Sequence, residues 1–370
     1  MSILNRRLAI GAATILITAA AAAPASAADT QAQLKALVKQ DGYPGALASV
    51  TTRKGHVRNV TAGVGDLKTR EPVPVDGEVR IGSNTKTFTS VVVLQLVGEG
   101  KIELDAPVER YLPNLLRGEG IDGRNITVRQ LLNHTSGLPN YTNFLADGIL
   151  PYQHWYAEPR TLLDLALAQP ATHPPGATFE YSNTNFLVAG LIIEQVTHRP
   201  ISELITRRII KPLGLRHTYF PLPGEEELRG PHPHGYHHDD PNLPLVDVTE
   251  QDPSFGWVAG QMVSTPSELN RFFGAVVQGR LLPANLLRQM RTTVPADELG
   301  QGVRYGLGIS STPLSCGGLA WGHGGTITGY STTNAVTDDG RGAAVAVTNL
   351  PREEEQLHRI EQVVDDGLCN

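Results

Sequence analysis

The sequence of 370 residues is poor in sulfur and in aromatic side chains, with two cysteines, three methionines and 6% Phe, Trp and Tyr. Two cysteines without histidines at zinc-ligand spacing do not make a structural zinc site. Beyond the N-terminal region, no apolar run is long enough to span a bilayer. The net charge is −6 and no basic stripe occurs, so nucleic acid is not an expected partner. What remains, with 38 glycines and 26 prolines, indicates a turn-rich globular protein of one large domain or two lobes.

The first 27 residues have the pattern of a secretory signal peptide. Arg6 and Arg7 precede an apolar stretch over residues 8–23, and Ala25-Ser26-Ala27 offers the small residues of a cleavage site. A membrane anchor is the alternative, but the stretch is short for a bilayer span. We therefore expect cleavage near Ala27 and a secreted mature protein of residues 28–370 that is not attached to a membrane. Sec and Tat export both stay open.

Export also bears on the two cysteines, Cys316 and Cys369. In an oxidising compartment an even pair predicts a disulfide, which here would tie the C-terminal tail to the region near Leu314. Two free thiols are the alternative.

Strand patterns lie at both ends of the chain, and helical patterns lie between them. The strands are expected at residues 46–52, 56–63, 302–310, 319–323, 329–336 and 342–348. The helices are expected at residues 30–40, 162–168, 185–197, 201–210, 266–277 and 352–364, and Thr127 with Gln130 forms a capping box that opens another. The predicted fold class is therefore α/β, in the α+β sense. A sheet is built from both termini (about 28–105 and 296–370) and flanked by helices, with a large, mostly helical insertion (about 106–295).

The first candidate catalytic residues lie on the helix predicted after Gly82. They are Ser83 and, three residues later, Lys86. Residues at this spacing are neighbours on one helix face. A serine hydroxyl attacks only when a nearby group takes its proton, and a lysine whose pKa is lowered by desolvation or a second cation can do so. The N–H groups at the helix N-terminus favour the charge that develops in acyl transfer. A chain this long contains about one S-x-x-K by chance, so a capping serine beside a surface lysine is the alternative.

Two further motifs carry residue types that acyl transfer uses. Tyr181-Ser182-Asn183 precedes the helix predicted from Asn185. A phenol beside a cationic lysine can have its pKa lowered and act as a general base or proton shuttle, and an asparagine amide can donate to a substrate carbonyl. In Trp321-Gly322-His323-Gly324-Gly325-Thr326, the glycines allow a substrate backbone to approach, and a strand-edge N–H can be a second oxyanion donor. A buried tyrosine, a capping asparagine and a structural histidine are the alternatives.

With S-x-x-K, Y-x-N and H-x-G in this order, the chain resembles the serine penicillin-recognising hydrolases of the class C β-lactamase type. It is especially similar to the secreted D-alanyl-D-alanine carboxypeptidase/transpeptidases. The similarity covers nearly the whole mature chain, including His134-Thr135-Ser136-Gly137-Leu138, Thr249-Glu250-Gln251 and Tyr305-Gly306-Leu307-Gly308. Leu314-Ser315-Cys316 and the late Cys369 also match the disulfide positions of those enzymes.

The resemblance implies a β-lactamase/transpeptidase-like fold with an antiparallel sheet, and a reaction through an acyl-enzyme on Ser83. Lys86 would assist the deprotonation of Ser83, and Tyr181 would relay the proton to the leaving amine; which of the two is the primary base stays open. The substrate would be oriented by Asn183 and His323, and the oxyanion would be bound by the N–H groups of Ser83 and of Thr326, which follows Gly325. The implied activity is that of a secreted serine D-alanyl-D-alanine carboxypeptidase on peptidoglycan stem peptides. It would be acylated by β-lactams, monomeric, and without a cofactor or metal.

Two positions depart from the pattern of that family. Ser310 and Gly324 stand where the close carboxypeptidases carry an arginine and a threonine that help to bind the terminal carboxylate of the substrate. Losing a charge-assisted contact costs roughly 1–3 kcal/mol of recognition, although Thr326 remains. A related serine hydrolase (an esterase, a D-aminopeptidase or amidase, or a β-lactamase) is therefore the alternative. A non-enzymatic penicillin-binding protein is less favoured, because Ser83, Lys86 and Tyr181 are all intact.

The segment 232–240 (His-Pro-His-Gly-Tyr-His-His-Asp-Asp) is rich in metal-ligand residue types. Its prolines favour a surface loop, so no metal site is expected there. His134 is expected to be structural. The sequence contains no G-x-S-x-G, which argues against an α/β-hydrolase.

Overall fold

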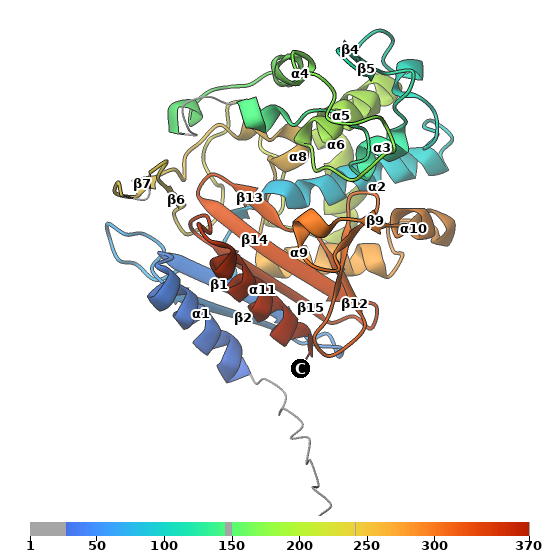
Figure 1. Ribbon diagram of the computed structural model, residues 1–370. Helices are drawn as coiled ribbons and strands as arrows, with labels where there is room; N and C mark the ends of the chain where they lie inside the picture. Colours follow the sequence, from blue (N-terminus) through green and yellow to red (C-terminus); the bar gives the residue numbers. More distant parts are fainter. Residues whose placement is uncertain (1–26, 145–149, 241, 370) are drawn as a thin grey trace, which may run out of the picture.

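The computed structural model describes residues 27–144, 150–240 and 242–369 (Figure 1). Apart from Ala27, the predicted signal peptide lies outside these ranges. Within them, no helix combines the length and the apolar character that crossing a membrane requires.

One antiparallel sheet joins the two ends of the chain. Its strand order is β2 (Val57–Gly63), β1 (Gly45–Thr51), β15 (Gly342–Val347), β14 (Tyr330–Thr337), β12 (Leu319–Gly322), β11 (Ser310–Pro313), β10 (Arg304–Tyr305) and β9 (Val294–Pro295). A further strand, β13 (Gly325–Ile327), pairs with β14 off this path. The first strand lies beside the last, with Ala46 opposite Val347. The predicted fold class, a sheet built from both termini, is therefore confirmed.

The sheet is covered on both faces, and strand β15 shows how. Every residue of β15 is buried. Because side chains alternate along a strand, Ala343, Val345 and Val347 face one way and Ala344 and Ala346 the other. The first set packs with α1 (Ala27–Asp41) and α11 (Glu354–Cys369), and the second faces α9 (Pro266–Val277) (Figure 1).

The helical part lies on the α9 side of the sheet (Figure 1). Its remaining helices are α2 (Thr85–Gly98), α3 (Val128–Leu132), α4 (Pro159–Leu167), α5 (Asn183–Thr197), α6 (Ile201–Ile205), α7 (Lys211–Leu213), α8 (Trp257–Gly260) and α10 (Ala284–Met290). Its short strand pairs are β3 (Val79–Arg80) with β8 (Val263–Ser264), β4 (Arg117–Gly118) with β5 (Ile121–Asp122), and β6 (Tyr236–His237) with β7 (Val246–Asp247). Helix α2 is buried from Thr85 to Leu94, as expected for a helix in the centre of a protein.

Several local predictions agree with the structure and several do not. Both bonds of the predicted capping box are present, from Gln130 N to Thr127 Oγ1 (3.2 Å) and from Thr127 N to Gln130 Oε1 (2.9 Å). The helix predicted over 201–210 turns π-helical from residue 206; Pro212, which has no N–H to donate, follows this turn. The single strand predicted over 302–310 is present only in part: β10 lies within it, and a turn separates β10 from β11, which begins at Ser310. That turn needs glycine, because a Cβ on Gly308 would lie 2.0 Å from Ser90 Oγ.

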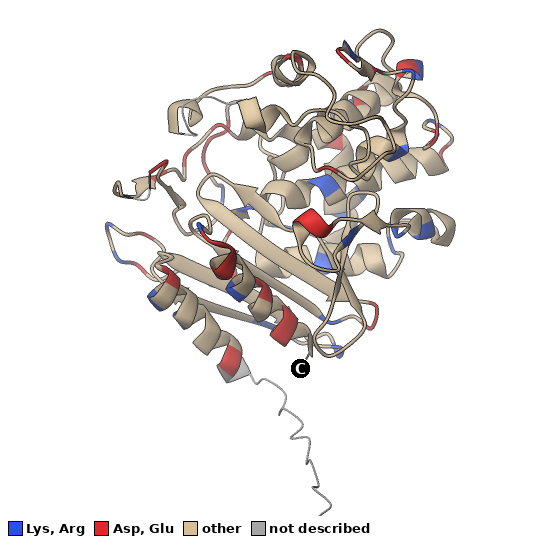
Figure 2. Ribbon diagram, viewed as in Figure 1, with Lys and Arg blue, Asp and Glu red and all other residues tan. Residues whose placement is uncertain are grey.

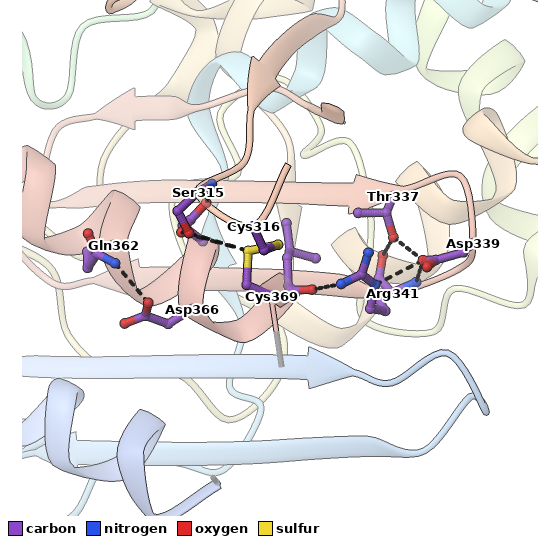
Figure 3. Close-up of a disulfide and its surroundings, with 10 residues drawn as sticks. Ser315, Cys316, Thr337, Asp339, Arg341, Gln362, Asp366 and Cys369 are labelled. Carbon is purple, nitrogen blue, oxygen red and sulfur yellow. Dashed lines mark hydrogen bonds and ion pairs between the residues drawn. A yellow bond between two sulfur atoms is a disulfide. The ribbon is translucent and has the colours of Figure 1, made fainter. Parts of the chain in front are cut away.

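The predicted disulfide between Cys316 and Cys369 is present, with 5.6 Å between the Cα atoms (Figure 3). It ties the end of α11 to the turn after β11. The same junction carries a bond from Ser315 N to Asp365 Oδ1 (3.0 Å) and one from the Arg341 guanidinium to the carbonyl of Leu368.

Charges of both signs mix along α1 and α11 on the outer face of the sheet (Figure 2). The two helices are joined by a bond from Arg359 Nε to Asp41 Oδ1 (3.0 Å), and the side chain of Asp41 is only 1% exposed.

Candidate active site

Ser83 lies in the 3₁₀ turn η1 (Gly82–Asn84), which runs directly into α2. Asn84 holds this turn against the sheet: its Nδ2 donates to Ile81 O (2.8 Å) and to Thr332 Oγ1 (2.6 Å) on β14. Asn84 is buried whereas Ser83 is partly exposed. The hydroxyl of Ser83 therefore lies where the sheet meets α2, and the two hydrogen bonds of Asn84 hold the backbone of its turn.

Lys86 is fully buried and its Nζ has three neighbours. Ser83 Oγ lies 2.9 Å away, Asn183 Oδ1 2.6 Å and Ala259 O, on α8, 2.8 Å. No carboxylate is among them, so burial alone lowers the pKa of Lys86 well below its ordinary value of 10.5.

The hydrogen-bonding capacity of a neutral lysine fits these neighbours. A neutral amine has two N–H groups and one lone pair. The amide oxygen of Asn183 and the carbonyl of Ala259 can only accept, so they take the two N–H groups. In its cationic form Lys86 Nζ donates to Ser83 Oγ at 2.9 Å; in the neutral form its lone pair faces the hydroxyl proton of Ser83 instead. The geometry therefore places a base where a serine nucleophile needs one.

Tyr181 stands beside this pair, with the ring centroid 5.0 Å from Lys86 Nζ. The expectation of a lowered phenol pKa is wrong. Burial raises the pKa of Tyr181, and a hydrogen bond with Ser83 only partly opposes the shift. The prediction failed because it assumed a cationic lysine, whereas burial disfavours the charge on Lys86. Tyr181 therefore keeps its proton at neutral pH, as a proton donor does. Its backbone N–H donates to Glu298 Oε1 (2.8 Å), on the exposed turn η7 (Asp297–Leu299).

Asn183 is the first residue of α5, so the helix begins two residues earlier than predicted. Its backbone N–H donates to Asn140 Oδ1 (3.1 Å), and its Nδ2 lies 3.5 Å from Thr142 Oγ1. Its carbonyl oxygen is thereby turned toward Lys86. The side chain thus holds the lysine, in addition to the predicted role of orienting substrate.

His323 lies between β12 and β13, and its contacts fix its tautomer. Nδ1 is 2.5 Å from the carbonyl of Gly324, which can only accept, so Nδ1 carries the proton. Nε2 is 2.7 Å from the hydroxyl of Tyr305 and accepts from it. Burial lowers the pKa of His323 to about 3. The histidine is therefore neutral and bonded to Tyr305, and its ring centroid lies 6.3 Å from that of Tyr181.

The glycines near β13 bring this strand against the nucleophile turn. A Cβ on Gly82, whose φ is +47°, would lie 2.7 Å from Thr326 N, and one on Gly325 would lie 2.0 Å from Ile81 O. These two glycines thus serve packing within the protein, whereas the sequence suggested room for a substrate. Gly324 differs from them, because a Cβ built on it would make only an ordinary contact, 3.7 Å from Thr332 O. Thr326 is exposed beside the turn that carries Ser83.

The structure therefore brings together Ser83, Lys86, Tyr181 and Asn183, and places Gly325 and Thr326 against the turn that carries Ser83. His323 reaches the group through Tyr305. The sequence reasoning missed the carbonyl of Ala259, which no side-chain motif can reveal. It also assigned no role to Tyr305, although the Tyr-Gly-Leu-Gly motif was visible.

Two positions flagged in the sequence have other partners. The hydroxyl of Ser310 donates to Gly322 O (2.9 Å) within the sheet, so it is engaged where an arginine was expected. In the histidine-rich segment, His234 Nδ1 lies 2.6 Å from Asp247 Oδ2 and His238 Nδ1 2.9 Å from Leu243 O. Among the described residues, no three His, Cys, Asp or Glu side chains are grouped as a metal site requires.

Comparison with known proteins places this arrangement in a family. The family model described as Beta-lactamase matches residues 30–367. The chain is similar to the crystal structure of a D-stereospecific amidohydrolase from Streptomyces sp., with 40% identity, a TM-score of 0.84, and coverage of 92% of this chain and 98% of that one.

Among curated proteins the matches are shorter. Protein flp of Staphylococcus aureus (strain MW2) is 30% identical over 199 residues, which are 52% of this chain and 39% of that protein. A Salmonella typhimurium (strain LT2) protein, provisionally named D-alanyl-D-alanine carboxypeptidase, is 34% identical over 147 residues, 38% of this chain and 33% of that protein. The match thus spans about two fifths of the first of these relatives and one third of the second.

Proposed function

This chain belongs to the beta-lactamase family of serine hydrolases, and we propose that it hydrolyses amide bonds to D-amino acids through an acyl-enzyme on Ser83. The observation that carries the proposal is the set of partners around Lys86. Two carbonyl oxygens accept N–H groups of Lys86, and in the neutral amine the lone pair faces Ser83 Oγ at 2.9 Å. The D-stereospecific amidohydrolase, 40% identical over nearly its whole length, supports the choice of substrate class.

The reaction begins with proton transfer from Ser83 to Lys86. Oγ attacks the substrate carbonyl carbon, and the oxyanion is bound by the N–H groups of Ser83 and Thr326. The C–N bond then breaks, and the leaving amine takes the phenolic proton of Tyr181, which is replaced from the ammonium of Lys86. Water hydrolyses the ester on Ser83 and regenerates the enzyme. A β-lactam would acylate Ser83 by the same first steps.

An amide or amine-bearing substrate suits this site better than one with a terminal carboxylate. Ser310 is hydrogen-bonded within the sheet, and Gly324 has no side chain, so the two positions expected to bind a carboxylate offer no cation. The carboxylate of Glu298 lies against the backbone of Tyr181 and adds negative charge at the rim. Like charges repel, which disfavours an anionic substrate group there.

A D-alanyl-D-alanine carboxypeptidase is the second candidate. Thr326 is exposed on β13 beside the nucleophile turn, so its hydroxyl can meet a substrate carboxylate. The partial similarity to a protein provisionally named as such an enzyme points the same way.

Rates on three substrates distinguish the candidates: a D-alanine anilide, its L-enantiomer, and a diacyl-L-Lys-D-Ala-D-Ala peptide. We expect the D-anilide to be cleaved at least about tenfold faster than the other two. Faster release of D-alanine from the peptide, blocked by a β-lactam, would instead establish the carboxypeptidase. Ser310→Arg is the matched variant, because an added guanidinium should raise the rate on the peptide and leave the rate on the anilide unchanged.

We also propose that the protein is secreted after cleavage near Ala27 and works as a monomer. N-terminal sequencing of the exported protein and its mass in solution test the two statements. An uncleaved N-terminus or a larger assembly would overturn them.

A further inference from the structure

His134 packs against the ring of Tyr181 and is fully buried. No step of the proposed reaction uses it. The centroids of the two rings are 4.3 Å apart, and their planes are tilted by 30°. The imidazole also meets the ring of Tyr305 edge-on at 5.0 Å, and two phenylalanine rings complete the enclosure. His134 therefore touches both tyrosines that connect Ser83 to His323.

His134 also holds the backbone on either side of Tyr181. Its carbonyl accepts a hydrogen bond from Glu180 N (2.9 Å). Its Nδ1 accepts from Ser182 N (3.2 Å) and from Asn185 Nδ2 (3.1 Å). The residues before and after Tyr181 thus both donate their amide protons to this one histidine, so the ring of Tyr181 has little freedom to move.

The arrangement at His134 carries two costs. Because Nδ1 accepts two N–H groups, the neutral ring bears its proton on Nε2, which is buried without a hydrogen-bond partner among the described residues. Its φ of +56° is unfavourable for a residue with a side chain. A leucine, a phenylalanine or a glycine would avoid the unpaired Nε2, and the glycine would also avoid the backbone cost, but each would leave Ser182 N and Asn185 Nδ2 without this acceptor. Strain of this kind next to a reactive group is grounds for a functional hypothesis.

We propose that His134 is a positioning residue for Tyr181: its ring and its Nδ1 hold the phenol on Ser83. The ring supports the face of the phenol, and Nδ1 fixes the turn that leads into α5. The inference rests on the proposed function, since it matters only if Tyr181 passes on a proton.

Two substitutions separate this role from general packing. His134→Gly removes the ring and the acceptor and is at ease at a positive φ. His134→Asn keeps an acceptor near the place of Nδ1 and tolerates the left-handed backbone. Each substitution is made in the wild-type protein and in the Tyr181→Phe variant. For every protein, kcat and KM are measured with an activated ester and with the D-anilide, and the melting temperature is measured separately.

We expect His134→Gly to lower kcat on the anilide about 10–100-fold with KM changed less than about threefold, because a displaced proton donor affects the transition state. His134→Asn should recover kcat in part, to a value between those of His134→Gly and the wild type, because it restores the acceptor but not the ring. In the Tyr181→Phe background, His134→Gly should change kcat by no more than about twofold, because the group that it positions is already missing.

An unchanged kcat in His134→Gly overturns the inference, and so does an Asn variant as slow as the Gly variant. An equal loss in both backgrounds also overturns it, because that is the result of general destabilisation. Failure of the proposed function is a different outcome: the wild-type protein would neither cleave the anilide nor be acylated at Ser83.

Discussion

Replacing Lys86 by methionine tests the identity of the general base. Methionine fills nearly the same buried volume but lacks the basic nitrogen that lies 2.9 Å from Ser83 Oγ in Lys86. A positioned general base is worth about 10²–10⁴ in rate. We therefore expect acylation of Ser83 to slow by about that factor in Lys86→Met, and Lys211→Met, an exposed lysine on α7, to leave it unchanged.

The pH dependence follows from the direction of the pKa shift of Lys86. With its ordinary pKa of 10.5, roughly 0.03% of the lysine would be neutral at pH 7, and each unit by which the pKa falls raises that fraction tenfold. Burial lowers it, so the rising limb of the acylation rate should lie well below pH 10.5 and disappear in Lys86→Met. As pH falls through the folded-state pKa, Lys86 gains a proton, the lone pair is lost and the rate drops. Between that pKa and 10.5 the unfolded chain binds more protons, so the stability that this group contributes rises with pH.

The assay is the rate of adduct formation with a chromogenic β-lactam across pH 5–11, followed by absorbance and by intact mass. The melting temperature is measured in parallel, because Asn183 Oδ1 and Ala259 O lose their donor in Lys86→Met, at about 1–3 kcal/mol each. Acylation of Lys86→Met at the wild-type rate, in a folded protein, would refute the assignment. A rising limb centred near pH 10.5 would show that burial does not lower the pKa of this lysine.

Three further predictions follow from single contacts. Tyr181→Phe should lower kcat about 10²–10⁴-fold on an anilide and much less on an activated ester, because only the amine needs a proton to leave; equal losses in stopped-flow assays would contradict the relay. Gly82→Ala should lower activity about 100-fold, since its Cβ would lie 2.7 Å from Thr326 N; full activity would mean that the turn and β13 can separate freely. Reduction of the bond between Cys316 and Cys369, 53 residues apart, should cost about 4 kcal/mol of unfolding free energy in denaturant titrations and leave kcat at 25 °C unchanged; an unchanged midpoint would contradict the estimate.

The parts of the fold that depend on local patterns could be read from the sequence. Short, largely apolar runs next to turn residues predicted β1 and β15, and the pair Thr127 and Gln130 located the start of α3, because a capping box is satisfied within four residues. Strand β13 was not predicted. It is three residues long and pairs with β14 across the turn at Thr328 and Gly329. Its contact with the turn that carries Ser83 depends on Gly82 and Gly325, and no local pattern encodes that contact.

In the active site, too, contacts within one helical turn could be predicted, whereas contacts between distant segments could not. Residue types and spacing were enough to pair Ser83 with Lys86, whose neighbourhood is set by one helical turn. The pKa of Tyr181 was predicted in the wrong direction, since the charge state of Lys86 depends on burial by segments far apart in the chain. Ala259 contributes through its backbone carbonyl, which any residue could supply.

The most direct test of the central claim is the intact mass of the protein, with peptide mapping, during turnover of a D-amino-acid ester and after exposure to a β-lactam. We expect one acyl group per chain, located on Ser83 and absent from Ser83→Ala. Turnover that continues in Ser83→Ala, or an adduct on any other residue, would contradict it.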